Sequence, residues 1–153
     1  MSVVFLKPEE RYIRSYWETF GDICREGIYL ALSEPFPYKS TVEFMKNMIS
    51  DGAPSLFVID DESDRCVGWC DAISEDGING RLGMGLAEPY RNRGYGTELL
   101  KRVIELSREY GYKYLFLEVW KTNGRAVHLY EKAGFGTYDE DDKKLYMKLK
   151  LDK

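Results

Sequence analysis

The sequence has few of the residues on which metal sites and disulfide frameworks depend. Its 153 residues include one histidine and three cysteines. A lone imidazole, His128, cannot supply the histidine cluster that many zinc sites use. Cys24, Cys66 and Cys70 are odd in number and have no Cys-x-x-Cys spacing, which supports neither a disulfide framework nor a zinc site. We therefore expect reduced cysteines and no bound metal.

The sequence also lacks an excess of basic residues and any long apolar run. Lysine and arginine number 22 against 26 acidic residues, for a net charge of −4. Proteins that bind nucleic acid usually carry a basic footprint, so nucleic acid is not an expected partner. No apolar run approaches the ~18 residues of a membrane span, and the stretch Met1 to Pro8 is too short for a signal peptide. We expect a cytoplasmic, soluble protein with no membrane partner.

The composition that remains, 44% hydrophobic and 31% charged, is that of an ordinary globular chain. A chain of this length forms one core and buries roughly two thirds of its unfolded surface. We therefore expect a single domain over residues 1–153.

Hydrophobic periodicity and turn residues predict the element order βααβββαβαββ. This order indicates an α/β sandwich around a mixed, mostly antiparallel sheet. The predicted strands are 3–6, 55–59, 66–73, 81–86, 114–120, 135–138 and 144–149; the predicted helices run from Pro8 to about Gly27, from Ser40 to just before Gly52, from the loop at 91–97 to about Tyr110, and from Arg125 to Ala133.

Two features of the first half concern the helices. Ser40-Thr41-Val42-Glu43 has the spacing of a capping box and predicts that the second helix opens there. Between the first two helices, Tyr29 to Tyr38 carries Pro35 and Pro37, which predicts a loop. This loop either lines a substrate pocket or is a packed connection.

The segment Arg91 to Thr97 lies between a predicted strand and a predicted helix. The first turn of a helix has N–H groups without intrahelical partners and a partial positive charge, so an anion binds well there. Gly94 and Gly96 lack side chains that would hold a phosphate away from the backbone. Arg91 and Arg93 add charge, and the segment predicts a phosphate site, with an ordinary turn and solvated arginines as the alternative.

The details of this segment exclude two kinds of nucleotide loop. A Walker A loop needs a Gly-Lys pair, and the chain has none. The dinucleotide fingerprint needs a third small residue where Leu99 stands. The remaining pattern, Arg-x-x-Gly-x-Gly, resembles the pyrophosphate loop of the GNAT superfamily of N-acetyltransferases.

A second signature follows about thirty residues later and extends the resemblance over most of the chain. Leu117-Glu118-Val119, Asn123, Ala126 and Leu129 to Phe135 resemble a GNAT segment at every fixed position. The stretches Val67 to Asp71 and Leu82 to Gly85 also resemble a bacterial group of that family. Two signatures in the right order are far more specific than either alone.

The resemblance implies the GNAT fold, with splayed central strands and the pantetheine arm of acetyl-CoA in the gap between them. The strand interruptions at Gly83 and Gly85 suit that splay. Backbone groups of Met84 and Leu86 would bind the pantetheine, the loop would hold the pyrophosphate, and Asn123 would contact the arm. The cofactor-binding residues implied are Met84, Leu86, Arg91, Asn92, Arg93, Gly94, Tyr95, Gly96, Thr97 and Asn123.

The resemblance also implies two catalytic residues, Glu118 and Tyr130. An alkyl ammonium has a pKa of about 10.4, so a base or a water chain must deprotonate it near neutral pH. Glu118 is the candidate base; the alternative is a strand carboxylate satisfied by hydrogen bonds. Tyr130 would stabilise the departing thiolate by a hydrogen bond, and its alternative is core packing.

We therefore expect an acetyl-CoA-dependent N-acetyltransferase acting on a primary amine of a small molecule. The alternatives are a protein N-terminal or ribosomal-protein acetyltransferase and a GNAT module that binds acyl-CoA without catalysis. The family resemblance is also compatible with a homodimer. The acidic candidates for binding the acceptor ammonium are Glu34, Asp71, Glu75 and Asp139.

Overall fold

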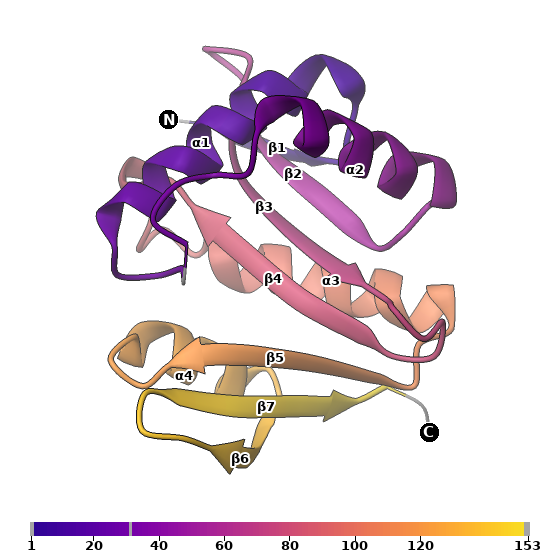
Figure 1. Cartoon of the computed structure of the whole chain (residues 1–153), viewed down its shortest axis with the longest axis vertical. Helices are drawn as coiled ribbons and strands as arrows, with labels where there is room; N and C mark the ends of the chain where they lie inside the picture. Colours follow the sequence, from indigo (N-terminus) through magenta and orange to yellow (C-terminus); the bar gives the residue numbers. More distant parts are fainter. Residues whose placement is uncertain (1, 31, 152–153) are drawn as a thin grey trace.

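The computed structural model describes residues 2–30 and 32–151. A seven-stranded sheet runs through the molecule in the order β1-β2-β3-β4-β5-β7-β6 (Figure 1). Its one parallel pair among the described residues is β4 with β5; the other neighbours are antiparallel. The strands are β1 (Val3–Leu6), β2 (Ser55–Asp60), β3 (Arg65–Ile73), β4 (Gly80–Leu86), β5 (Tyr114–Trp120), β6 (Gly136–Glu140) and β7 (Lys144–Lys150).

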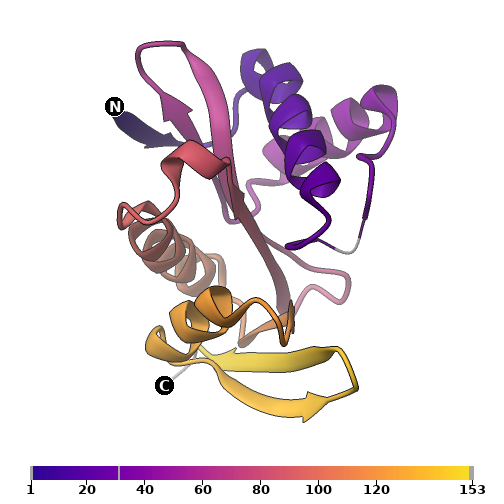
Figure 2. The same cartoon turned by 90° about the vertical axis from the view of Figure 1, so that its left-hand side faces the viewer.

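Helices cover both faces of the sheet. The helices are α1 (Ile13–Glu26), α2 (Tyr38–Asp51), α3 (Tyr95–Tyr110) and α4 (Gly124–Lys132). Figure 2 shows α1 and α2 on one face and α3 on the other. The predicted element order and the mixed, mostly antiparallel sheet are thus confirmed.

The core has two parts, one on each side of the sheet. Side chains of α3, β5 and β7, such as Leu99 and Met147, form the larger part. Side chains of α1, α2 and β2, such as Ile13 and Met45, form the second part. Strand β3 contributes to both because successive side chains point to opposite faces: Cys70 lies in the first part and Trp69 in the second.

The central strands separate soon after they meet. β4 and β5 pair at Gly80 with Leu115 and at Arg81 with Phe116, and no further pairing between them is found in the described chain. Figure 1 shows the two strands diverging toward their carboxyl ends. The splay predicted from the resemblance is confirmed.

The first two helices begin differently from the prediction. Glu9 is extended, a short 3-10 turn covers Glu10–Tyr12, and α1 starts only at Ile13. Helix α2 starts at Tyr38, directly after Pro37, and its N-cap makes no side-chain hydrogen bond. The prediction that α2 opens with a capping box at Ser40 is therefore wrong.

The physical reason lies in the direction of the hydroxyl groups. Ser40 Oγ and Thr41 Oγ1 donate backward to the Pro37 carbonyl oxygen at 3.0 and 3.1 Å, instead of accepting an N–H bond ahead of them. Short hydroxyl side chains can bond to the backbone in either direction, so the spacing alone did not fix the start of the helix.

Glycines in β4 allow bulky aromatic packing next to the splay. A Cβ at Gly85 would lie 2.6 Å from Trp69 Cη2, whereas a Cβ at Gly83 would meet only Asp71 Oδ1, at 3.6 Å. Gly85 is therefore required by the Trp69 ring, and Gly83 leaves space in front of Asp71.

We expect Gly85→Ala to destabilise the protein by about 1–3 kcal/mol, because Trp69 has to move in a packed core. Gly83→Ala is the matched control and should change the free energy of unfolding by less than about 0.5 kcal/mol. Urea denaturation of both variants measures the difference. Equal losses in the two variants would contradict the assigned role of Gly85.

Candidate active site

A pocket of about 430 Å³, here called the gap pocket, lies where β4 and β5 separate. Its walls come from the separated part of β4, the segment before and at the start of α3, the end of β5, α4, and the last part of α1 with the segment after it. The lining residues are Ile23, Tyr29, Leu30, Leu82, Gly83, Met84, Gly85, Leu86, Arg91, Asn92, Gly94, Gly96, Thr97, Glu118, Val119, Asn123, Arg125, Ala126, His128, Leu129, Tyr130 and Lys132. The two sequence signatures thus meet around one space.

The loop before α3 has the geometry of an anion site. Asn92 and Gly94 have positive φ angles of 65° and 86°, and Gly94 is the N-cap of α3. The first turn closes with Glu98 N–H donating to Gly94 O at 3.3 Å. The N–H groups of Gly96 and Thr97 therefore have no acceptor inside the helix, and both residues line the gap pocket.

The side chain of Arg91 is engaged with other parts of the protein. Its Nη1 and Nη2 donate to the Glu26 carboxylate at 2.8 and 2.7 Å, and its Nε donates to Leu86 O at 2.8 Å. The guanidinium also lies 4.4 Å from the centre of the Tyr29 ring. The charge of Arg91 is therefore already paired, which the sequence did not reveal, and its fork joins the loop to the end of α1.

Arg93 is exposed and its Nε donates to Pro89 O at 2.9 Å. This contact holds the side chain beside the loop that precedes α3. Arg93 is not among the residues that line the gap pocket.

The edge of β4 that faces β5 offers backbone groups to the gap pocket. On its other edge β4 pairs with β3 from Arg81 to Leu86, whereas its pairing with β5 ends at Arg81. An extended ligand arm can add to such an edge as a further strand. Met84 and Leu86 lie on this segment, although the Leu86 carbonyl already accepts the Arg91 side chain.

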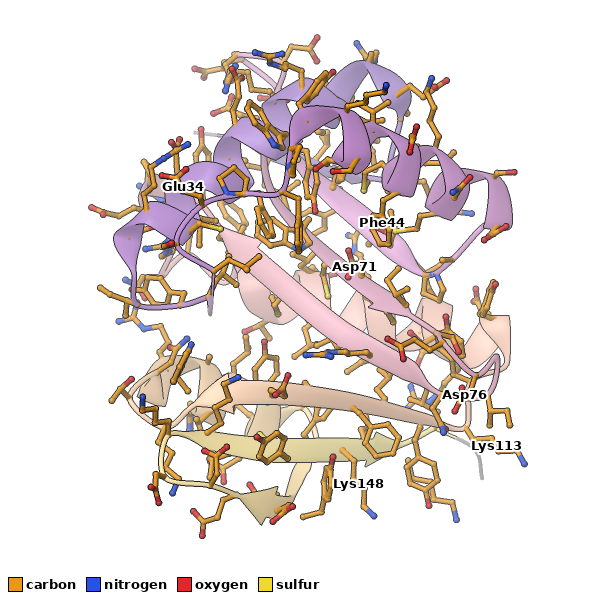
Figure 3. All side chains as sticks on the ribbon, viewed as in Figure 1. Glu34, Phe44, Asp71, Asp76, Lys113 and Lys148 are labelled. Atoms are coloured by element: carbon orange, nitrogen blue, oxygen red, sulfur yellow. The ribbon has the colours of Figure 1, made fainter. Side chains whose placement is uncertain are left out.

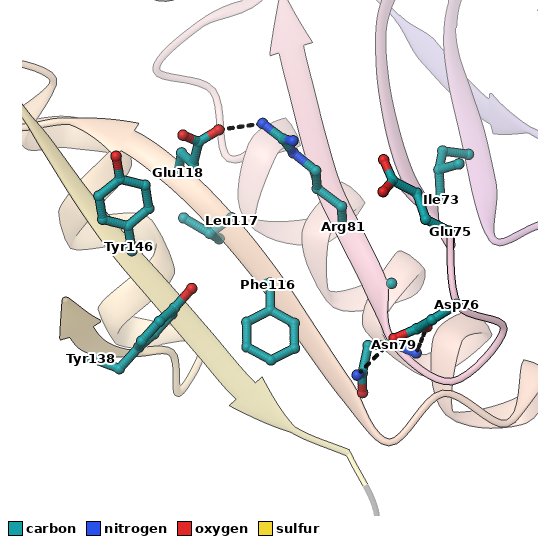
Figure 4. A pocket seen from close by; sticks show the side chains of 11 residues that line it. Ile73, Glu75, Asp76, Asn79, Arg81, Phe116, Leu117, Glu118, Tyr138 and Tyr146 are labelled. Atoms are coloured by element: carbon teal, nitrogen blue, oxygen red, sulfur yellow. Dashed lines mark hydrogen bonds and ion pairs between the residues drawn. The ribbon is translucent and has the colours of Figure 1, made fainter. Parts of the chain in front are cut away.

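Glu118 stands at the junction of the gap pocket with a second hollow of about 460 Å³, which Figure 4 shows. Its carboxylate forms ion pairs with Arg81 of β4 and, at 3.5 Å, with Lys144 of β7. The side chain is 30% exposed. Two cations thus fix the orientation of Glu118.

Tyr130 of α4 is 8% exposed and lines the gap pocket. Its ring packs edge-on against Phe135 with the centroids 5.8 Å apart. Burial, with a smaller contribution from Cys70, raises the pKa of Tyr130 well above its ordinary value. The phenol is therefore protonated at neutral pH and can donate a hydrogen bond.

Asn123 caps α4. Its side-chain oxygen accepts the Ala126 N–H at 3.3 Å. The amide nitrogen of this side chain is then the atom that can donate a hydrogen bond to a ligand in the gap pocket.

A third hollow, here called the aromatic pocket, has a volume of about 640 Å³ and lies between α1, α2 and the sheet. It shares Leu30, Gly83 and Met84 with the gap pocket. Its lining residues are Tyr16, Trp17, Phe20, Leu30, Phe36, Ser40, Thr41, Phe44, Trp69, Asp71, Arg81, Gly83 and Met84. The sequence alone does not distinguish these roles for the α1 aromatics, because a helical apolar face looks the same whether it packs in a core or lines a pocket.

The acidic candidates lie in different places, so they do not form one site. Glu34 pairs with Arg25 at 3.3 Å, Asp139 accepts the Glu140 N–H at 2.9 Å, and Glu75 lines the hollow of Figure 4. Of the four, Asp71 is the one that lines the aromatic pocket. Figure 3 shows Asp71 and Phe44 of α2 on the same side of the sheet.

Among residues 2–30 and 32–151, no group of three or more His, Cys, Asp or Glu side chains is arranged to hold a metal ion. No helix in that part of the chain is both long and apolar enough to span a bilayer.

Residues 13–135 match the sequence profile of the acetyltransferase (GNAT) family. The chain belongs to the GNAT family. A phosphinothricin acetyltransferase from Sinorhizobium meliloti, solved in complex with AcCoA, superposes with a TM-score of 0.86 at 14% identity, covering 99% of this chain and 89% of that one. At this identity the likeness shows the shared GNAT fold.

Two curated relatives match part of the chain. An uncharacterized N-acetyltransferase, YobR, from Bacillus subtilis is 36% identical over 81 residues, which are 53% of this chain and 32% of that protein. Streptothricin acetyltransferase from Streptomyces lavendulae is 32% identical over 92 residues, 51% of this chain and 49% of that protein. The chain thus spans about a third to a half of the length of these two GNAT relatives.

The Arg91–Glu26 ion pair joins the loop before α3 to the end of α1. We expect Arg91→Lys to lower the free energy of unfolding by about 1–3 kcal/mol, because lysine cannot replace the bidentate fork. A double-mutant cycle with Glu26→Gln, measured by denaturant unfolding, should give a coupling energy of at least about 1 kcal/mol. Additive effects of the two substitutions would show that the pair does not join α1 to the loop.

Proposed function

We propose that the protein is an acetyl-CoA-dependent N-acetyltransferase acting on a primary amine of a small molecule. One observation carries this proposal: the gap between β4 and β5 connects the N-terminus of α3 with the aromatic pocket through Gly83 and Met84. A pyrophosphate, an extended arm and an acceptor would thus find adjoining places.

The residues around the gap pocket fit the cofactor that the family implies. The positive φ angles at Asn92 and Gly94 and the N–H groups of Gly96 and Thr97 suit a pyrophosphate. The free β5 edge of β4, with Met84 and Leu86, suits the amides of the pantetheine arm. The remaining residues proposed to contact it are Arg93 and Tyr95 through their backbone and Asn123 through its amide. The Arg91 N–H donates to Glu88 O at 3.1 Å, so Arg91 would act by holding the loop in place. Acetyl-CoA, when bound, would supply the thioester from which the acetyl group is transferred.

In this proposal Glu118 receives the proton that the acceptor ammonium loses, directly or through water. Its place between the gap pocket and the hollow of Figure 4 gives it access to solvent. Arg81 and Lys144 keep its carboxylate in one orientation. In this role Glu118 would act as a relay that passes the proton on to water.

Tyr130 has the complementary role of stabilising the thiolate that leaves. A neutral phenol buried beside the gap pocket can donate a hydrogen bond to sulfur. Because burial disfavours the tyrosinate, hydrogen bonding is favoured over full transfer of the phenolic proton.

The first test is release of thiol from acetyl-CoA in the presence of primary amines. We expect amine-dependent release, with a loss of kcat of about 10²-fold or more in Glu118→Gln and in Tyr130→Phe. Acetyl-CoA should bind Tyr130→Phe as tightly as the wild type, because this variant keeps the ring and its packing. Tight binding without thiol release from any amine would instead identify a non-catalytic module, and turnover only of peptide α-amino groups would identify a protein acetyltransferase.

The pH profile tests the state of Tyr130 separately. Since burial raises its pKa above the ordinary value of about 10, kcat should not fall between pH 7 and about pH 10 through loss of the phenolic proton. The check is kcat at saturating amine for the wild type and Tyr130→Phe. A descending limb below about pH 9 that disappears in Tyr130→Phe would contradict the assignment.

A further inference from the structure

The carboxylate of Asp71 lies partly buried in the wall of the aromatic pocket. Asp71 pairs with Gly83 in the β3–β4 register, so the two residues face the same side of the sheet. Because Gly83 has no side chain, the space in front of Asp71 Oδ1 stays open. In the described ranges, 2–30 and 32–151, no hydrogen bond or ion pair to this carboxylate is found.

Four other charged or polar side chains of the pocket wall already have partners. Arg81 pairs with Glu118, and the Ser40 and Thr41 hydroxyls donate to Pro37 O. Trp17 Nε1 donates to Phe36 O at 2.7 Å. Asp71 is therefore the group of the wall that can offer a full charge to a bound molecule.

Aromatic rings make up most of the rest of the wall. Phe36 and Phe44 are 59% and 48% exposed, so apolar surface remains uncovered around the pocket. Tyr16 and Phe20 pack against Trp69, with centroid distances of 5.5 and 5.2 Å, and keep the inner wall rigid. Such rings favour an apolar skeleton and also attract a cation over their faces.

We propose that the aromatic pocket binds the acceptor, that Asp71 pairs with its ammonium, and that the acceptor is a singly charged amine with an aromatic or other apolar skeleton. This inference rests on the proposed acetyltransferase function. A polyamine or an aminoglycoside would bring several charges to a wall with one unpaired carboxylate. The ammonium would lie beside Gly83 and Met84, the residues shared with the gap pocket.

The reaction balances with Asp71 as a binding group. The acceptor ammonium loses one proton, and its neutral nitrogen forms a bond to the acetyl carbon. As the bond from that carbon to sulfur breaks, the nitrogen loses a second proton, and the leaving thiolate takes up one proton to give coenzyme A thiol. The other proton leaves by the route proposed for Glu118, so Asp71 holds the acceptor without being consumed.

The groups around Asp71 make this contact sensitive to pH. Burial raises the pKa of Asp71 to about 7. Tyr16 of α1, Cys70 of β3 and Tyr112 before β5 have pKa values raised by burial and are uncharged at pH 7, and Arg81 of β4 is paired with Glu118. Asp71 thus changes charge near neutral pH, and its attraction for an ammonium is lost as the pH falls below about 7.

The test is binding of 2-phenylethylamine to the full chain, measured by calorimetry and by the fluorescence of Trp17 and Trp69. At pH 8 we expect Asp71→Asn to weaken binding at least about tenfold. Glu34→Gln removes a carboxylate that pairs with Arg25 instead, and it should stay within about twofold. Wild-type binding should weaken about tenfold from pH 8 to pH 6, and Asp71→Asn should show no such change. The neutral analogue 2-phenylethanol should bind both proteins equally.

Folding of the variant is checked independently. Because burial disfavours the charged carboxylate, the Tm of Asp71→Asn at pH 8 should equal or exceed that of the wild type. The pH dependence of the wild type tests the same contact without any substitution. Equal binding of 2-phenylethylamine by wild type and Asp71→Asn, or wild-type binding independent of pH, would overturn the inference.

Thiol release from acetyl-CoA with 2-phenylethylamine, spermidine, phenylalanine and an alanine-initiated peptide separates the two proposals. Preference for 2-phenylethylamine, with kcat/KM reduced at least about tenfold in Asp71→Asn, supports both. Turnover of another acceptor, unaffected by Asp71→Asn, leaves the acetyltransferase proposal standing and overturns the inference. Asp71-dependent binding without turnover of any acceptor supports the pocket and overturns the acetyltransferase proposal.

Discussion

The early end of pairing between β4 and β5 is the constraint on which the rest of the structure depends. Backbone N–H and C=O groups need partners, and these strands stop supplying them to each other after Arg81 and Phe116. The ion pair from Arg81 to Glu118 spans the two strands at this point. Lys144 of β7 adds a second contact to the same carboxylate. The opening is thus held by charged contacts rather than by a continued ladder.

A second contact joins the loop beside this opening to helix α1, which packs on the opposite face of the sheet from α3. Arg91 leaves the loop before α3 and reaches Glu26 in the last turn of α1, beside Tyr29. The gap pocket and the aromatic pocket are therefore bordered by elements that are tied together. A change at the loop before α3 can in this way affect the wall on which an acceptor would lie.

Much of the architecture could be predicted because local sequence patterns determine where helices and strands form. Period-two and helical apolar spacing gave the order of the α-helices and strands. The start of α2 was missed because Ser40 and Thr41 bond backward.

The contacts of the site depend on register and could not be predicted locally. Glu118 meets Arg81 only because β4 and β5 lie side by side, across 37 positions of sequence. The sequence did not distinguish Asp71 from Glu34 as a candidate for binding the acceptor. The difference arises because the pairing of β3 with β4 places Asp71 opposite Gly83. Helical spacing of the α1 aromatics likewise did not show that Trp17 and Phe20 line a pocket while Ile13 is core.

The most direct measurement of the central claim is hydrogen exchange of the backbone amides with and without coenzyme A. We expect slower exchange on binding in residues 82–86 of β4 and in residues 92–97 before and within the first turn of α3, with β1 and β6 unchanged. Saturated binding that leaves both segments unprotected would contradict the claim that the gap between β4 and β5 is the cofactor site.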